Sequence, residues 1–153
     1  MKKSSLFIWL IIIFSFIGLA ASVESTLSHY NPAISEFCNV SAKFDCDTVN
    51  TSKYSEMFGI PVAVFGLLAY GLALASAIIY KLRKQDYVLD LIILISVSGF
   101  LFSLYLTYIE AFVLKTWCLV CVTQQLSILI MMISSLVLRL KKQKEPSISN
   151  IHE

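Results

Sequence analysis

Residues 60–80 read IPVAVFGLLAYGLALASAIIY, and this stretch of 21 residues contains no charged side chain. A helix needs roughly 20 apolar residues to cross the hydrocarbon core of a bilayer. Pro61 lies near the start, where a helix tolerates a missing N–H. The surface helices of water-soluble proteins carry a polar face, and this stretch has none. It therefore predicts a transmembrane helix.

Three further stretches have the same character: Leu6–Val23, Leu91–Ile109 in a span of about 88–109, and Thr116–Leu138. Hydrophobic residues make up 58% of the chain and charged residues 14%, whereas a soluble domain carries about 25% charged residues. The net charge of +2 is too small to indicate nucleic-acid binding. We predict an all-α integral membrane protein in which one domain, residues 1–153, forms a bundle of four transmembrane helices.

Basic residues are concentrated in three segments beside these spans. Nine of the twelve Lys and Arg residues lie there: Lys2, Lys3, Lys81, Arg83, Lys84, Arg139, Lys141, Lys142 and Lys144. Because cytoplasmic segments of membrane proteins are enriched in Lys and Arg, both termini and a solvated tail, residues 139–153, are predicted to be cytoplasmic. The loop 24–59 and the short turn Glu110–Lys115 are then external. The protein would belong to the plasma membrane or a bacterial inner membrane.

The N-terminal segment has a second interpretation, as a cleaved secretory signal peptide. Lys2, Lys3, an apolar core and the small residues of 18–22 fit that pattern. The apolar run is longer than the core of about 7–15 residues that signal peptides have. We therefore favour a retained first helix.

The external segment is polar and long for a simple connection, and loops of this length often act as lids or binding elements. Asn31-Pro32 predicts a turn. A weak capping pattern that begins at Ser52 predicts a short helix near Ser52–Phe58. Gly59 would let the chain bend into the second span.

Cys118-Leu-Val-Cys121 lies at the external end of the fourth span. Residues three apart share one face of a helix, so the two sulfurs lie close enough for a disulfide or a dithiol. The partial positive charge of the helix N-terminus favours a thiolate. This placement is typical of a redox-active pair, although cysteines also occur as inert apolar residues in membrane helices.

Cys38 and Cys46 lie in the external segment, so all four cysteines are predicted on one side of the membrane. One interpretation is a structural disulfide between these two. A four-cysteine zinc site is another, although its ligands usually repeat a C-x₂₋₄-C spacing. The functional interpretation is a relay. The loop pair exchanges disulfides with a water-soluble protein, and the helix pair then reduces a lipid-soluble acceptor.

Four motifs occur in the order Cys38-x₇-Cys46, Asp47-Thr-Val-Asn-Thr-Ser-Lys-Tyr54, Phe58-Gly-Ile-Pro61 and Trp117-Cys118-x-x-Cys121. In combination they resemble the vitamin K epoxide reductase (VKOR) family, from about the first span to the end of the fourth. The resemblance implies a membrane thiol–disulfide oxidoreductase that passes electrons to a quinone, ubiquinone or menaquinone. Such enzymes in bacteria support disulfide formation in exported proteins.

The resemblance also implies a role for each cysteine. Cys38 would exchange with the partner protein, and Cys46 would pair with Cys38 and, in a relay intermediate, with Cys118. Cys121 would face the quinone. Ser52 matches a Ser/Thr position whose hydroxyl can donate a hydrogen bond to a quinone oxygen, with a helix cap or plain loop serine as the alternative.

Two departures from the family pattern bear on function. Animal members have a tyrosine four positions after the last cysteine, where this chain has Gln125, which puts anticoagulant sensitivity and epoxide chemistry in doubt. Many bacterial members carry a fused thioredoxin-like domain, and this sequence shows none. We therefore expect a separate extracytoplasmic thioredoxin-fold protein, similar to DsbA, as the partner.

Several polar residues carry weaker expectations. Gln124 and Gln125 are uncharged polar residues inside a span and are expected to hydrogen-bond across helices, with contact to the quinone as the alternative. Glu110 and Asp45 are candidates for moving protons to the quinone, although no sequence feature singles them out. His29 is expected to be an ordinary loop residue.

Other functions fit parts of the sequence. A non-enzymatic membrane subunit would use disulfides only to brace its external loop, and a quinone epoxide reductase would run the chemistry in the opposite direction. A DsbB-type oxidase has its CxxC pair in the first external loop, the reverse of the order here. A metal transporter would need thiol or acidic groups deeper in the spans, and the sequence has none between Cys121 and Arg139.

Overall fold

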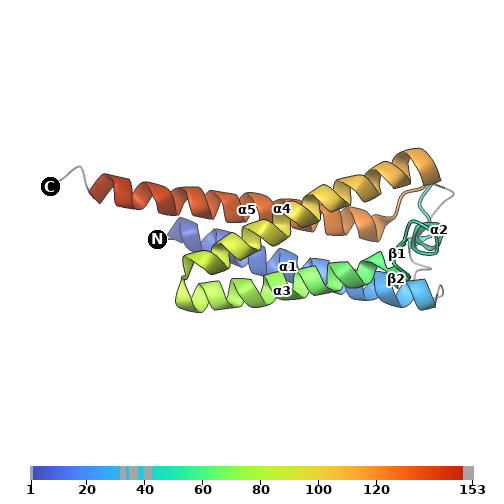
Figure 1. The fold of residues 1–153 in the computed structure, drawn as a ribbon, viewed down its shortest axis with the longest axis horizontal. Helices are drawn as coiled ribbons and strands as arrows, with labels where there is room; N and C mark the ends of the chain where they lie inside the picture. The colour runs from blue at the N-terminus through green and yellow to red at the C-terminus, as the bar shows by residue number, and fades with distance from the viewer. Residues whose placement is uncertain (1, 32–33, 35–37, 40–42, 150–153) are drawn as a thin grey trace.

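The computed structural model describes residues 2–31, 34, 38–39 and 43–149. Its four long helices are α1 (Lys2–Tyr30), α3 (Val62–Arg83), α4 (Asp86–Tyr108) and α5 (Leu119–Ser149). Both termini lie at one end of the bundle and the short elements at the other (Figure 1). Four segments are long and apolar enough to cross a membrane, and in the third of them α4 continues into the π-helix η2 (Ile109–Leu114). The predicted four-helix membrane fold is confirmed.

Each helix packs mainly on two neighbours: α1 and α4 both lie against α3 and α5. Lipid tails are as apolar as leucine, so membrane helices associate through small residues and hydrogen bonds between helices. Buried serines meet this requirement, for example Ser15 of α1, whose Oγ lies 3.5 Å from the Met131 sulfur of α5. Large side chains such as Leu68, Leu94 and Leu101 are exposed, as expected where a helix faces lipid.

Tyr70 of α3 joins three of the helices. Its ring is buried against Gly18 of α1, at a position where an added methyl group would overlap the ring atoms. Its hydroxyl donates a hydrogen bond to the Gln124 carbonyl oxygen of α5, at 2.6 Å. The absence of a side chain at Gly18 is therefore a packing requirement.

Gly18→Ala is expected to destabilise the protein by about 1–3 kcal/mol, because overpacking forces the Tyr70 ring out of its position. Gly71→Ala is the matched control, since its nearest neighbour, Leu19 Cδ1, lies 4.0 Å from the added methyl group. Thermal unfolding in detergent measures both variants. Equal melting temperatures for the two would contradict the packing role of Gly18.

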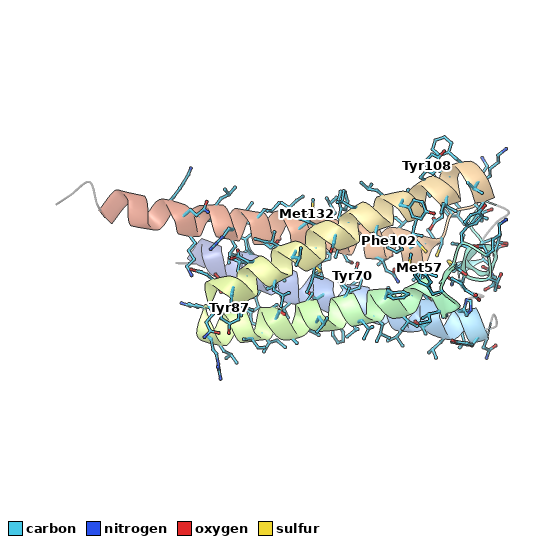
Figure 2. All side chains as sticks on the ribbon, in the orientation of Figure 1. Met57, Tyr70, Tyr87, Phe102, Tyr108 and Met132 are labelled. Carbon is cyan, nitrogen blue, oxygen red and sulfur yellow. A yellow bond between two sulfur atoms is a disulfide. The ribbon has the colours of Figure 1, made fainter. Side chains whose placement is uncertain are left out.

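At the end that holds the termini, ion pairs connect α4 and α5. Arg139 of α5 pairs with Asp90 at 3.1 Å and with Asp86 at 3.8 Å, and Lys142 also pairs with Asp86. Asp86 opens α4, where a negative charge suits the helix dipole. In Figure 2, Tyr87 lies near this end and Tyr108 near the opposite end, both on the outside of the bundle. Tyrosines at both ends match the aromatic belts of membrane proteins.

The opposite end, which we call the cysteine end, carries α2 (Cys46–Asn50) and the strands β1 (Glu56–Met57) and β2 (Ile60–Pro61). The prediction of a short helix near Ser52–Phe58 is wrong in position. Asp45 begins the helix earlier, because its side chain caps the N–H of Thr48. The later residues form a hairpin whose two turn residues, Phe58 and Gly59, have φ of 56° and 77°, as a type I′ turn requires.

Three predicted boundaries also change. Helix α1 extends seven residues past Val23, to Tyr30, so the connecting loop is shorter than 24–59. The predicted turn Glu110–Lys115 is largely π-helical and ends at Lys115, where φ is 55°. Helix α5 continues to Ser149, so the predicted tail 139–153 begins as helix. The expected turn at Asn31-Pro32 includes a residue outside those described.

His29 is not the ordinary loop residue that the sequence predicted. It lies in the last turn of α1, where its Nδ1 donates to the Asn50 carbonyl oxygen at 2.7 Å. Its Nε2 lies 3.3 Å from the Glu56 carboxylate of β1. The extension of α1 past Val23 therefore anchors both short elements of the cysteine end.

Candidate active site

A short backbone pairing brings the two cysteine-bearing segments together. The Trp117 N–H donates to the Lys43 carbonyl oxygen at 2.8 Å, and the Asp45 N–H donates to the Trp117 carbonyl oxygen at 3.2 Å. Cys46 and Cys118 are the next residues after Asp45 and Trp117. The pairing therefore places these two cysteines side by side, although 72 positions separate them in the sequence.

Polar contacts hold the loop that carries Cys46. The Asp45 carboxylate accepts hydrogen bonds from the backbone and side chain of Thr48, and these hold the pKa of Asp45 below its usual value. The Asn39 side chain accepts from the Cys46 N–H at 3.0 Å and donates to Asp47 at 2.6 Å. These hydrogen bonds hold Asn39, the residue after Cys38, against the N-terminus of α2.

Three sulfur atoms gather at this point. Cys38 and Cys46 form a disulfide with a Cα–Cα distance of 5.7 Å. The sulfurs of Cys38, Cys46 and Cys118 all lie within 4.8 Å of one another, and all three residues are fully buried. Thiol–disulfide exchange requires a thiol close to a disulfide sulfur, and Cys118 has this position.

Cys118 and Cys121 are both free thiols. Cys118 immediately precedes α5, and its sulfur accepts the Cys121 N–H at 3.3 Å, as the side chain of a helix N-cap residue does. Cys121 lies one turn further into the bundle, where it packs against the buried cysteine cluster and also lines a cavity. Among the described residues, the three-sulfur cluster excludes Cys121, so a four-cysteine zinc site is not assembled in this state.

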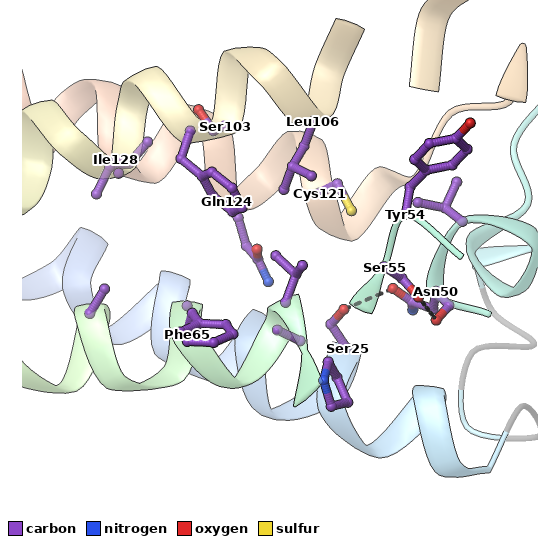
Figure 3. Close-up of a pocket in the computed structure, with 18 of the residues that line it drawn as sticks. Ser25, Asn50, Tyr54, Ser55, Phe65, Ser103, Leu106, Cys121, Gln124 and Ile128 are labelled. Carbon is purple, nitrogen blue, oxygen red and sulfur yellow. Dashed lines mark hydrogen bonds between the residues drawn. The ribbon is translucent and has the colours of Figure 1, made fainter. Parts of the chain in front are cut away.

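The cavity has a volume of about 460 Å³ and lies between the four helices, beside α2 and the hairpin (Figure 3). Most of its lining is apolar. Many of the polar side chains that line it lie near the cysteine end: Ser25, His29, Asn50, Ser52, Tyr54, Ser55, Glu110, Cys121 and Gln124. Tyr70 of α3 and Ser98 and Ser103 of α4 line it as well. An apolar pocket with a few polar groups is typical of a binding site for a small hydrophobic molecule.

Two side-chain amide nitrogens that line this cavity have no hydrogen-bond partner within the described part of the chain. They are Asn50 Nδ2 and Gln124 Nε2, and both nitrogen atoms are buried. The Asn50 orientation is set by Ser25, which donates to Asn50 Oδ1 at 2.9 Å. Gln124 points from α5 into the space in front of α3 (Figure 3). Buried donors nearly always have a partner, so these two indicate a ligand with acceptor oxygens.

The two glutamines of α5 therefore differ. Gln125 Oε1 accepts from Thr107 of α4 at 2.8 Å, which confirms the predicted hydrogen bond across helices. That prediction is wrong for the Gln124 side chain, which faces the cavity. For Gln124 the alternative, contact with the quinone, stays a prediction. Its spacing from Cys121 is the sequence signal that favours this alternative, because residues three apart share a helix face.

Ser52 lines the cavity, as a quinone-binding residue would. Its hydroxyl, however, donates to the Val49 carbonyl oxygen at 2.9 Å, in the turn that follows α2. The role of Ser52 as a donor to the ligand stays a prediction, and it would require that hydrogen bond to open.

The comparison with protein families agrees with this arrangement. The family model described as "Vitamin K epoxide reductase family" (VKOR) matches residues 9–136, which include all four cysteines. The chain belongs to the VKOR family. A search of curated proteins found no match. VKOR proteins are membrane oxidoreductases that generally use quinones, and the VKOR match together with the four apolar helices identifies a multi-pass membrane protein.

The VKOR match covers the elements that build the site. It begins inside α1 and ends inside α5, so Ser25, the loop pair, the cavity residues and the helix pair are all part of the family region. The quinone ring is an apolar group with two carbonyl oxygens, and the cavity offers apolar walls and two unpaired donors. The residues of this VKOR protein therefore fit a quinone.

Proposed function

We propose that this protein is a quinone-dependent thiol–disulfide oxidoreductase. It takes electrons from an extracytoplasmic thioredoxin-fold protein, similar to DsbA, and thereby supports disulfide formation in exported proteins. The observation that carries the proposal is that the two cysteines of the helix pair have different surroundings. Cys118 contacts the loop disulfide, and Cys121 faces the cavity.

The first step involves the loop pair. A thiolate of the reduced partner attacks the Cys38 sulfur, the Cys38–Cys46 bond breaks, and Cys46 leaves as a thiolate. The second partner thiol then attacks the mixed disulfide, so the partner leaves oxidised. Two electrons have entered the loop pair, which is now a dithiol.

The second step moves these electrons to the helix pair. With Cys118 and Cys121 joined as a disulfide, the Cys46 thiolate attacks Cys118 and releases Cys121. Cys38 then attacks Cys46, which restores the loop disulfide and leaves two thiols on the helix. A loop disulfide beside a free Cys118 and a free Cys121, the state of the structure, is the product of this step.

The last step reoxidises the helix pair. A disulfide forms between Cys118 and Cys121, and two electrons and two protons are released. A lipid quinone held in the cavity would supply the acceptor for these two electrons and two protons. Asn50 Nδ2 and Gln124 Nε2 would bind its carbonyl oxygens, with Ser52 as a further candidate.

The same proposal includes an orientation in the membrane. The end that holds both termini carries Lys81, Arg83, Lys84 and the basic residues of α5. Because cytoplasmic segments are rich in Lys and Arg, we place this end in the cytoplasm and the cysteine end outside. Alkylation of single cysteines introduced at Lys84 and Tyr30, in intact cells with an impermeant reagent, tests the orientation. Labelling at Lys84 but not at Tyr30 would reverse it.

Gln124→Leu is expected to raise the KM for a soluble quinone analogue about fivefold, because a neutral hydrogen bond contributes about 1 kcal/mol. Gln125→Leu is the matched control. It removes the same group from the next residue, whose side chain contacts Thr107 outside the cavity. Steady-state kinetics over a range of quinone concentrations measures both variants. If the KM rises in Gln125→Leu but not in Gln124→Leu, Gln124 does not belong to the quinone site.

The function itself is tested with the purified protein in detergent, a reduced thioredoxin-fold protein and a soluble quinone analogue. The intact protein is expected to reduce the quinone, and Cys121→Ala is expected to stop it. Reduction of the quinone by Cys121→Ala at the intact rate would overturn the assignment of the cavity. An intact protein that is inert with every thiol donor and quinone would favour a structural subunit. Net reduction of a quinone epoxide by dithiols would favour the opposite direction.

A further inference from the structure

The buried carboxyl of Glu110 lies between the helix pair and the cavity. Glu110 is the second residue of the π-helix η2 and is only 4% exposed. Its Oε2 accepts the Cys118 N–H at 3.2 Å. It lines the same cavity as Cys121 and Gln124, and its carboxyl lies close to the Cys121 thiol. One carboxyl is therefore hydrogen-bonded to Cys118 and close to Cys121 at the place where the quinone would bind.

This position is costly for a carboxyl group that only supports the fold. Burial of a charged group costs stability unless a counter-ion or several hydrogen bonds compensate it. None of the ion pairs found among the described residues includes Glu110. The π-helical turn, a rare element that often occurs at functional sites, places Glu110 here. Its carboxyl lies close to a thiol that must lose a proton.

We propose that Glu110 is the proton-transfer residue of the helix pair: it accepts the proton of the Cys121 thiol and delivers it to an oxygen of the bound quinone. The inference rests on the proposed function. It explains how a proton crosses a cavity with apolar walls, where water is a poor carrier.

The protons and electrons balance in this step. The Cys121 S–H bond breaks and its proton passes to the Glu110 carboxylate. The Cys118–Cys121 disulfide forms, the Cys118 proton is released, and two electrons pass to the quinone. Glu110 delivers the Cys121 proton to one quinone oxygen and returns to its carboxylate form. The second quinone oxygen would take up one proton in exchange for the one that Cys118 releases, so two electrons and two protons are transferred in total.

Other titratable groups lie on the elements packed around η2. Cys46 and Asp47 belong to α2, Tyr105 and Tyr108 end α4, and Cys118 precedes α5. Cys46 is held in the loop disulfide, and both tyrosines are exposed on the outside of the bundle. Within the cavity, the Glu110 carboxyl lies close to the Cys121 thiol, itself a reacting group.

Glu110→Gln is the decisive variant, because glutamine keeps the shape and can still accept the Cys118 N–H but cannot carry the proton. We expect kcat for quinone reduction to fall about 10²–10⁴-fold, the usual contribution of general acid–base catalysis. The KM for the quinone should be unchanged, and the pH profile of kcat should lose one titrating group. Glu110→Asp should recover part of the rate. Glu56→Gln, the same substitution at an exposed residue of the cysteine end, should match the intact protein.

A second readout is taken without quinone. The proton that Glu110 accepts from Cys121 when the helix pair is oxidised then has no quinone oxygen to pass to, and it stays on the carboxyl. The infrared difference spectrum between the disulfide and dithiol forms of the helix pair should contain a carboxyl C=O band. The band should disappear in Glu110→Gln and remain in Glu56→Gln. A glutamate that only accepts a backbone hydrogen bond would keep the same protonation in both forms and would give no such band.

The outcomes separate this inference from the proposed function. If the intact protein reduces quinone and Glu110→Gln does so with the same kcat and pH profile, the inference is overturned and the function stands. If the intact protein is inert, the function fails, and the infrared band alone decides whether Glu110 exchanges a proton with the cysteine pair. If Glu110→Gln no longer exchanges its loop disulfide with a dithiol, it has misfolded. Glu110→Asp is then the deciding variant. A carboxyl band at the same frequency in Glu110→Asp as in the intact protein would come from another carboxyl group, and this result would overturn the inference.

Discussion

Cys118→Ser is expected to lower quinone reduction by about 10³-fold or more, the scale on which loss of a covalent nucleophile acts. Cys118 is the residue that both contacts the loop disulfide and pairs with Cys121, so no path for two electrons remains without it. Serine is close in size to cysteine and fits the fully buried position. The rate of quinone reduction with a reduced thioredoxin-fold donor is the measurement.

A second measurement separates loss of chemistry from loss of fold. In Cys118→Ser the Cys38–Cys46 disulfide should still be reduced by the donor, once per protein molecule, since the first step does not need the helix pair. Thr123→Ser, a similar change on the exposed face of α5, should keep the intact rate. Multiple turnovers by Cys118→Ser would show that electrons reach the quinone by another route and would refute the relay.

A chain that carries Cys38→Ser and Cys121→Ser keeps only Cys46 and Cys118 and is expected to join them in a disulfide nearly completely. The two sulfurs lie within 4.8 Å of each other, and the backbone pairing at Trp117 holds their segments together. Disulfides form where the sulfurs approach without movement of the backbone. Mass spectrometry of peptides prepared without reductant measures the cross-link.

The matched control is the complementary pair of substitutions, Cys46→Ser with Cys118→Ser. It keeps Cys38 and Cys121, and Cys121 faces the cavity, outside the cluster of three sulfurs. Both thiols should stay free and react with an alkylating reagent. Cross-links of equal yield in the two proteins would mean that the loop moves freely. The claim that the backbone pairing holds Cys46 beside Cys118 would then be wrong.

Much of this protein could be predicted from its sequence, because the decisive features are local. An apolar run of about 20 residues specifies a membrane helix by its length alone, so the four spans needed no knowledge of packing. The CxxC spacing puts Cys118 and Cys121 on neighbouring turns, and the VKOR motifs can be read along the chain. The interhelical hydrogen bond of Gln125 followed from a polar residue within an apolar span.

Local patterns were less reliable at the cysteine end. The short helix was predicted about six residues too late, since the Asp45 cap and the positive φ values of Phe58 and Gly59 outweighed a weak capping pattern at Ser52. The end of α1 was predicted too early for a related reason. The polar residues after Val23 suggested a loop, but His29 holds this helix turn against Asn50.

Only the tertiary structure brought the site together. Cys118 meets the loop disulfide through hydrogen bonds between backbone segments more than 70 residues apart. Asn50, Glu110 and Gln124 line one cavity because α2, η2 and α5 pack around it. Such contacts depend on how small residues like Gly18 let the helices approach, and on which polar atoms remain without a partner. The length of an apolar run and the order of motifs are properties of the sequence. A buried donor without a partner can be recognised only in the folded chain, because it depends on which other polar groups lie within hydrogen-bond distance.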